Sequence, residues 1–197
     1  LEDMGLDDNT MVVFTSDNGP WFEGSSGQYR DRKGSSWEGG LRVPFIARWP
    51  SVIEPGQRSS AAAMNIDLLP TILDFAEIPQ PKDRAIDGKS LKGILTLHEN
   101  TPHEVLYLFN NDRIAGVRKG KWKLVVESFY RSGLPSFDNT DSYYGPNGLL
   151  FDLEKDPTET YSYTRENLEV ARELHELLEK GQADLKSHVL PNMWNRP

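Results

Sequence analysis

The sequence contains no cysteine, and this absence excludes two classes of site. Disulfide frameworks and thiolate metal sites both require cysteine side chains. An uninterrupted apolar run of about 18 residues is also missing, so the sequence predicts no membrane-spanning helix. No secretory signal pattern is visible, and the chain opens on Leu1 instead of methionine. We therefore expect the sequence to be a fragment of a longer protein.

Positive charge is scarce as well. The 197 residues include 22 Lys and Arg against 30 Asp and Glu, which gives a net charge of −8. Nucleic acids and anionic membranes are bound through clustered Lys and Arg side chains. Here the basic residues are scattered among acidic ones. The composition argues against a nucleic acid or a membrane as the main partner.

What the sequence does contain is an apolar segment that runs straight into a polar turn. Residues 10–16 are β-branched and apolar almost throughout, which predicts a strand buried on both faces of a sheet. Asp17 and Asn18 follow it directly. In open α/β sheets, ligands lie beyond the carboxyl ends of strands, so oxygen atoms placed there can hold a hard cation. An ordinary tight turn is the alternative, because Asn-Gly is also a strong hairpin signal.

Lys33 is the second part of this candidate site. It stands in a segment rich in glycine and serine, residues 19–40, and loops of that length inside a compact domain are usually functional or disordered. Its ammonium is a compact cation suited to an anionic ester group. The aromatic residues of the loop could line a sugar-binding mouth or simply pack on the sheet.

Three segments that occur in this order resemble the sulfatase family, nearest to arylsulfatases and N-acetylgalactosamine-6-sulfatases; they are residues 14–20, 33–44 and 67–73. Three later segments are also similar to sulfatase sequences, at residues 83–88, 119–124 and 150–157. The resemblance extends over about residues 1 to 160 and concerns only the carboxyl-terminal part of such an enzyme.

The resemblance implies roles for three residues. Asp17 and Asn18 match the Asp-Asn pair that completes a Ca²⁺ site in sulfatases, and Lys33 matches the lysine that contacts the substrate sulfate. Lys33 is thus the catalytic and substrate-binding candidate. The implied activity is hydrolysis of sulfate esters, on a sulfated sugar or an aryl sulfate, and the implied location is periplasmic or secreted.

The family's nucleophile is a formylglycine made from the first residue of a Cys/Ser-x-Pro-x-Arg motif, and this sequence has no such motif. The amino-terminal metal ligands of the family are missing too. We expect the chain to be inactive alone and to require the amino-terminal half of the same enzyme or a homo-oligomer partner. Two other functions stay open, which are hydrolysis of phosphate or phosphonate esters and a non-catalytic carbohydrate-binding or assembly role.

The predicted fold class is α/β. Residues 1–97 are expected to form the carboxyl-terminal portion of an alkaline-phosphatase-like sulfatase core, with a second strand at 43–49. A helix is expected at 67–76, where Asp67 would cap the first turn.

Residues 98–197 are expected to form a small α+β subdomain. Its four-stranded antiparallel sheet would use residues 105–109, 113–118, 122–126 and 149–153. A helix from about 165 to 180 would follow, capped by Thr164. Turns are expected at 110–112 and 119–121, and residues 128–148 carry no assignment.

Several further polar residues have less specific interpretations. The sequence favours surface positions for three histidines, His98, His103 and His188. Asp83 and Asp87 could join Asp67 in a carboxylate cluster for acid-base work, but a cap and a turn explain Asp67 and Asp87 better. Glu38 and Arg42 could position Lys33 or pair with each other.

Overall fold

The computed structural model describes residues 1–110, 113–128 and 147–188. These residues fall into two compact units. Unit 1 comprises residues 1–17 and 43–104, and unit 2 comprises residues 18–42 together with the described residues from 105 onward. In the described part of the chain, no helix combines the length and the apolar character needed to cross a bilayer.

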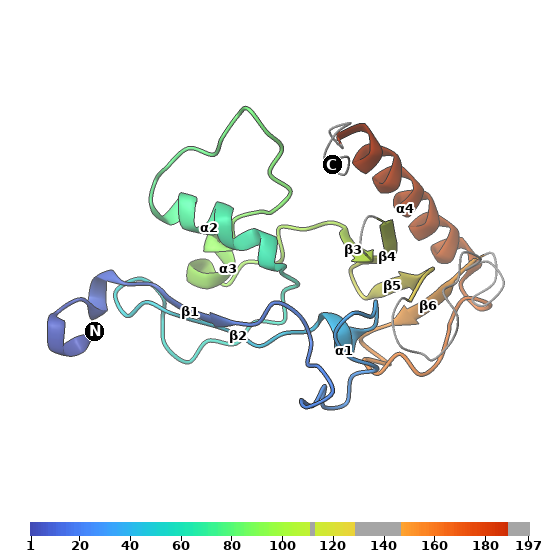
Figure 1. Cartoon of the computed structure of the whole chain (residues 1–197), viewed down its shortest axis with the longest axis horizontal. Coiled ribbons are helices and arrows are strands. Elements are labelled where there is room, and N and C mark those ends of the chain that lie inside the picture. The colour runs from blue at the N-terminus through green and yellow to red at the C-terminus, as the bar shows by residue number, and fades with distance from the viewer. Residues whose placement is uncertain (111–112, 129–146, 189–197) are drawn as a thin grey trace, which may run out of the picture. The chain divides into compact units, whose positions relative to one another are not determined.

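A two-stranded antiparallel ribbon forms the sheet of unit 1 (Figure 1). Two 3₁₀ helices, Glu2–Met4 (η1) and Asp7–Asn9 (η2), lead into β1, Val12–Thr15, which pairs with β2, Phe45–Arg48. The expectation that this first strand is buried on both faces is wrong for the described chain. Phe14 is 61% exposed and Val12 is 41% exposed, because β2 covers one edge of β1 and not its faces.

The helices of unit 1 follow β2. They are η3, Asn65–Asp67, then α2, Leu68–Phe75, and α3, Lys92–Leu97. The predicted helix at 67–76 is thereby confirmed. Pro70 stands in its first turn, where a missing backbone N–H leaves no hydrogen bond unmade. The ring of Trp49 packs 5.3 Å from that of Phe75, centroid to centroid, which joins the end of β2 to α2.

Unit 2 contains the predicted four-stranded antiparallel sheet. Its strands are β3, Leu106–Asn110, β4, Arg113–Lys119, β5, Trp122–Val125, and β6, Leu149–Asp152, in that spatial order. Gly120 turns the chain between β4 and β5 with φ 55°, as expected for residues 119–121. Residues 111 and 112 of the other predicted turn, and most of the segment 128–148, lie outside the described residues.

The sheet of unit 2 is covered on both faces. The helix α4, Leu168–His188, packs on β4 and β5 (Figure 1). The buried residues of that face are Ile114, Val117, Leu124, Leu150, Ala171, Leu174 and Leu178. On the opposite face Trp37, from the segment 18–42, packs with Val125, Phe151 and Leu153. Side chains alternate between faces along a strand, which is why Leu124 and Val125 belong to different clusters.

The predicted cap of the last helix is wrong. The Thr164 hydroxyl donates to the carbonyl of Gly148 (3.0 Å) and accepts from the N–H of Leu150 (2.9 Å), so it binds β6 and does not cap a helix. The helix starts at Leu168 instead, and the carbonyl of Asn167 accepts the N–H of Ala171 (3.0 Å). Local sequence cannot distinguish a threonine that caps from one that reaches across to a strand.

Candidate functional site

Asp17 and Asn18, the predicted metal ligands, lie just beyond the end of β1, and both are exposed. Within unit 1, the Asn65 side-chain amide donates to the carbonyls of Ser16 (2.9 Å) and Asp17 (3.2 Å). A carboxylate and an amide oxygen suit Ca²⁺, which takes six to eight oxygen ligands. Among the described residues, no group of three or more acidic, histidine or cysteine side chains could hold a metal. The pair therefore fits Ca²⁺ as part of a larger set of ligands.

Lys33 lies in unit 2 on a loop whose two ends are hydrogen-bonded together. Its backbone N–H donates to the carbonyl of Pro20 (3.0 Å), and the N–H of Gly19 donates to the carbonyl of Gly40 (2.9 Å). A Cβ atom at Gly19 would stand 1.9 Å from the carbonyl oxygen of Gly39, so the close approach requires glycine. Gly39 also lies close to other backbone, because a Cβ atom there would stand 2.3 Å from the carbonyl oxygens of Arg30 and Asp31.

Aromatic residues precede Lys33 in the same loop. The Arg32 guanidinium donates to the carbonyls of Trp21 (3.0 Å) and Gly24 (2.6 Å), which closes the turn that carries the two exposed rings. The rings of Trp21 and Phe22 meet edge to face, 5.5 Å apart. Their role in sugar binding stays a prediction.

Three buried charged residues of unit 2 form a cluster with Arg42, whose side chain is 44% exposed. The Glu38 carboxylate lies 2.6 Å from the Arg42 guanidinium and 2.9 Å from the Lys123 ammonium. The ammonium also lies 2.7 Å from the Glu159 carboxylate. The Lys123 and Glu159 side chains are both 0% exposed. Glu38 and Arg42 pair with each other, as one of the two alternatives predicted.

The two carboxyl groups of this cluster respond differently to the same surroundings. Burial raises the pKa of Glu38, but the charges of Lys123 and Arg42 outweigh it and leave the pKa below its usual value. For Glu159 burial prevails over Lys123, and its pKa is raised. Sequence reasoning missed Lys123 and Glu159 altogether. The signal in the sequence was that Lys123 is the one charged residue of the otherwise apolar strand β5.

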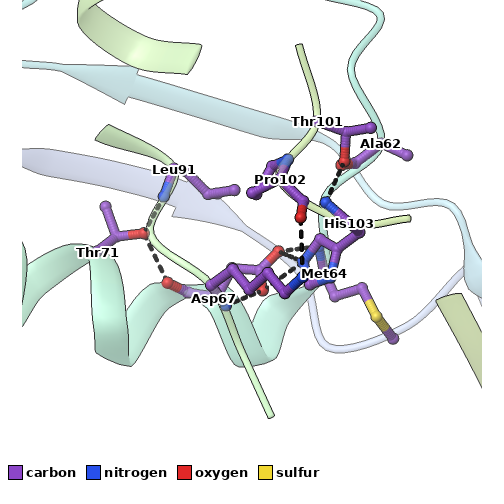
Figure 2. Close-up of polar contacts among 9 residues, drawn as sticks. Ala62, Met64, Asp67, Thr71, Leu91, Thr101, Pro102 and His103 are labelled. Atoms are coloured by element: carbon purple, nitrogen blue, oxygen red, sulfur yellow. Dashed lines mark hydrogen bonds and ion pairs between the residues drawn. The ribbon is translucent and has the colours of Figure 1, made fainter. Parts of the chain in front are cut away.

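A second buried pair lies in unit 1 (Figure 2). His103 Nε2 lies 2.8 and 2.9 Å from the two carboxylate oxygens of Asp67, and its side chain is only 5% exposed. The expectation of a surface position is wrong for His103 and confirmed for His98, whose side chain is 61% exposed. The His188 side chain lies outside the described residues.

Asp67 does not cap α2 with its side chain, in contrast to the prediction. Its carboxylate instead accepts the N–H groups of Met64 (2.7 Å) and Lys89 (2.9 Å), as Figure 2 shows for Met64. The reason is that a 3₁₀ turn precedes α2, so the carboxylate faces backward to the start of that turn. The backbone carbonyl of Asp67 accepts from the Thr71 hydroxyl (2.6 Å), which in turn accepts the N–H of Leu91 (2.9 Å). Through its carboxylate, Asp67 thus connects the stretches of unit 1 that contain Met64, Lys89 and His103.

Comparison with known families gives two matches along the chain. Residues 1–78 match the family described as Sulfatase, and residues 101–195 match the C-terminal region of aryl-sulfatase.

Individual relatives agree with this assignment. The chain is 34% identical to the steryl-sulfatase of Rattus norvegicus over 220 residues, covering 96% of the chain and 37% of that protein. It is 32% identical to the N-acetylgalactosamine-6-O-sulfatase of Bacteroides thetaiotaomicron, covering 91% of the chain and 37% of that protein. The crystal structure of a sulfatase from a Pseudoalteromonas species superposes with a TM-score of 0.82 at 25% identity, covering 98% of the chain and 40% of that structure.

The chain thus spans less than half of the length of these relatives. Its four-stranded antiparallel sheet and long final helix lie within the residues that match the C-terminal region of aryl-sulfatases. On the ordered motifs, the two family matches and the common fold, this chain belongs to the sulfatase family.

Proposed function

We propose that this chain is part of a sulfatase that hydrolyses sulfate esters, in which Lys33 contacts the sulfate and Asp17 and Asn18 contribute to a Ca²⁺ site. One observation carries the role of Lys33. The Lys33 backbone N–H donates to the carbonyl of Pro20, and Pro20 stands two residues after Asn18 in the sequence. The loop therefore brings the Lys33 backbone back to a residue that is near Asn18 in sequence. Membership of the sulfatase family supports the reaction class.

The chemistry of these side chains fits a sulfate ester. When bound, Ca²⁺ supplies a Lewis acid for an oxygen of the sulfate. The Asp17 carboxylate and the Asn18 amide offer it one charged and one neutral oxygen. The Lys33 ammonium offsets the negative charge of the sulfuryl group while the ester bond lengthens. Fixed charges of this kind often supply the largest single contribution to catalysis.

For the substrate we propose a sulfated sugar or an aryl sulfate. The exposed rings of Trp21 and Phe22 lie on the same loop as Lys33, and a flat ring suits both kinds of leaving group. The names of two relatives, a steryl-sulfatase and an N-acetylgalactosamine-6-O-sulfatase, refer to ring-bearing sulfate esters.

We further propose that the nucleophile comes from an amino-terminal half of the same enzyme. This sequence has no Cys/Ser-x-Pro-x-Arg motif, and it spans 37% of the steryl-sulfatase. Such a half would also bring the remaining oxygen ligands that Ca²⁺ needs in addition to Asp17 and Asn18.

The test is a Lys33→Ala substitution in the longer polypeptide that includes the nucleophile motif. Loss of one such charge contact is expected to lower kcat on an aryl sulfate by on the order of 10²- to 10³-fold, with little change in thermal stability. Lys82→Ala, at an exposed lysine of unit 1, serves as the control and should leave kcat unchanged.

Near-normal turnover by the Lys33→Ala enzyme contradicts the assigned role. Assaying an aryl phosphate in parallel separates the reaction classes. A clear preference of the unmodified enzyme for the phosphate would replace sulfate by phosphate ester hydrolysis.

A further inference from the structure

The buried charged cluster connects three segments that are far apart in the sequence. Glu38 and Arg42 lie at the two ends of α1, Glu38–Leu41, in the segment that also contains Lys33. Lys123 lies in the middle of β5, and Glu159 lies beyond the end of β6. All four residues belong to unit 2. Three stretches of the sequence, around residues 38, 123 and 159, therefore meet at one point.

Lys123 faces the segment 18–42 and not α4. Leu124, its neighbour in β5, packs in the cluster beneath α4, and Val125 packs with Trp37 on the opposite face. Because side chains alternate along a strand, Lys123 shares the face of Val125. The ion pairs of Lys123 with Glu38 and Glu159 lie on this same face.

The cluster is balanced in charge and mostly shielded from water. Two carboxylates and two cations meet. The side chains of Lys123, Glu38 and Glu159 are no more than 6% exposed, and that of Arg42, at the rim, is 44% exposed. A buried charge is costly unless it is paired, and removal of one partner leaves the other unpaired in a medium of low polarity. The cluster is therefore sensitive to the loss of any one of its three buried charges, those of Glu38, Lys123 and Glu159.

Backbone contacts extend the cluster into the loop. The Glu159 carboxylate accepts the N–H of Glu38 at the start of α1 (2.6 Å), and the Glu159 carbonyl accepts from the Arg30 side chain (3.0 Å). The carbonyl of Arg30 accepts the N–H of Gly39 (2.8 Å). The Arg30 guanidinium also stacks over the Trp37 ring at 3.7 Å. Glu159 thus holds the loop at two places on either side of Lys33.

We propose that Glu38, Lys123 and Glu159 are positioning residues, which dock the segment 18–42 on the sheet and so hold Lys33 in place for the sulfate. The docking is argued from contacts within unit 2, and its consequence for catalysis rests on the proposed function of Lys33. The chemical alternative is that the cluster only stabilises the sheet as a whole.

Amide hydrogen exchange followed by NMR in the 197-residue chain tests the proposal. The loop reporters are the N–H groups of Lys33, Gly39 and Arg42, which donate to Pro20, Arg30 and Glu38. The reporters for the rest of unit 2 are the N–H groups of Tyr163 and Ala171, which donate to Leu150 and Asn167. Local opening of the loop raises exchange at the first set alone.

The first variant is Lys123→Met, which keeps the bulk of the side chain and leaves two carboxylates facing one cation. We expect exchange at the loop reporters to become at least about tenfold faster relative to the Tyr163 and Ala171 reporters. Lys119→Met is the matched control, because Lys119 pairs with Glu173 (2.7 Å) at the surface of the same sheet. This control should leave the ratio unchanged.

Charge restoration separates docking from packing. The double variant Lys123→Met with Glu159→Gln again balances the charges, and we expect it to recover most of the loop protection. If the Lys123 side chain acted only by filling space, restoring the charge balance would not restore the loop protection. If Lys123→Met fails to fold, Glu38→Gln applies the test from the loop side and should raise the same ratio.

Equal acceleration at both sets of reporters, or no change at either, overturns the proposal. The readout needs no turnover, so it is independent of the activity assay. If the loop undocks as expected while the Lys33→Ala enzyme stays active, the catalytic role of Lys33 fails and the docking stands.

Discussion

At the scale of single residues, the Asp67 carboxylate connects several parts of unit 1. Asp67 accepts from the backbone N–H groups of Met64 and Lys89 and contacts the ring of His103 (Figure 2). These three groups come from separate stretches of unit 1, and Asp67 itself is fully buried. A carboxylate suits this position because both of its oxygens only accept hydrogen bonds.

We expect Asp67→Asn to destabilise the chain although it conserves shape. One of the two oxygens becomes an NH₂ group, which would face a backbone N–H as donor against donor. An unsatisfied buried polar group costs about 1–3 kcal/mol. The measurement is the free energy of unfolding in urea.

The control for this substitution is Asp83→Asn. Asp83 pairs with Arg84 at the surface, where both side chains are mostly exposed, and exposed pairs contribute little. Equal stability of the Asp67→Asn and the unmodified chains would contradict the organising role of this carboxylate.

Residue roles divide into those that a local pattern can predict and those that it cannot. Asp17, Asn18 and Lys33 could be proposed because they stand in recognisable motifs, and their roles stay predictions. Lys123 and Glu159 could not be proposed, because their partners are distant in sequence and a lone lysine in a strand usually faces solvent. His103 was misplaced for the same reason, since its partner Asp67 lies 36 residues earlier.

At the scale of secondary structure, the strands and the last helix follow from hydrophobic periodicity. The ends of the four predicted strands of unit 2 match those of β3 to β6 within one residue, because each strand has a run of apolar side chains between turn residues. The helix ends were less predictable. Asp67 and Thr164 both have the chemistry of N-caps, yet tertiary hydrogen bonds take their side chains elsewhere.

The turn after β6 depends on Asp156. Its carboxylate accepts from the Thr158 hydroxyl (2.6 Å) and from the N–H groups of Thr160 (2.6 Å) and Tyr161 (2.8 Å). Burial raises the pKa of Asp156, but these hydrogen bonds outweigh it and hold the pKa below the ordinary value of 3.8. The ionised form is therefore favoured in the folded chain.

This lowered pKa fixes the sign of a pH effect. An acid whose pKa is lower in the folded than in the unfolded chain stabilises the fold at pH values above the unfolded pKa, here near 3.8. The contribution is lost as the pH falls through the folded pKa. We expect Asp156→Ala to cost on the order of 1–3 kcal/mol at neutral pH and progressively less below pH 3.8.

Urea unfolding of the Asp156→Ala and unmodified chains at successive pH values measures this difference. Asp87→Ala, at an exposed aspartate, is the control. A difference between the chains that stays constant with pH would assign the effect of Asp156 to packing and not to its charge.

At the scale of the whole molecule, the two-stranded ribbon of unit 1 exposes large apolar side chains to solvent. Phe14 and Ile46 lie opposite each other in the register of β1 and β2, and they are 61% and 62% exposed. Contiguous exposed apolar surface of this kind marks an interface. Since the chain spans 37% of the steryl-sulfatase, we propose that the amino-terminal half of the enzyme covers this ribbon.

The double substitution Phe14→Ser with Ile46→Ser tests whether the amino-terminal half of the enzyme covers the ribbon. In the 197-residue chain it should lower the binding of a hydrophobic dye and leave the free energy of unfolding almost unchanged. In the longer polypeptide the same change should destabilise by several kcal/mol, because two buried apolar side chains are then lost.

Light scattering on the 197-residue chain tests the competing occupant. A dimer that dissociates on the double substitution would show that a second copy covers the ribbon instead. The sequence predicted these strands from their apolar content, but it could not reveal their exposure, since a run of apolar residues does not say what covers it. The predicted domain boundary near residue 97 stays a prediction, while contacts group residues 18–42 with those from 105 onward.

The long separation between Glu38 and Glu159 has a consequence for biosynthesis. Their hydrogen bond joins residues 121 positions apart, so the ribosome makes the lysine loop well before it makes the anchor. Until Glu159 has been synthesised, the loop lacks this hydrogen bond. A nonsense codon between β6 and Glu159 would therefore spare every proposed ligand and still remove the anchor of the loop, together with α4.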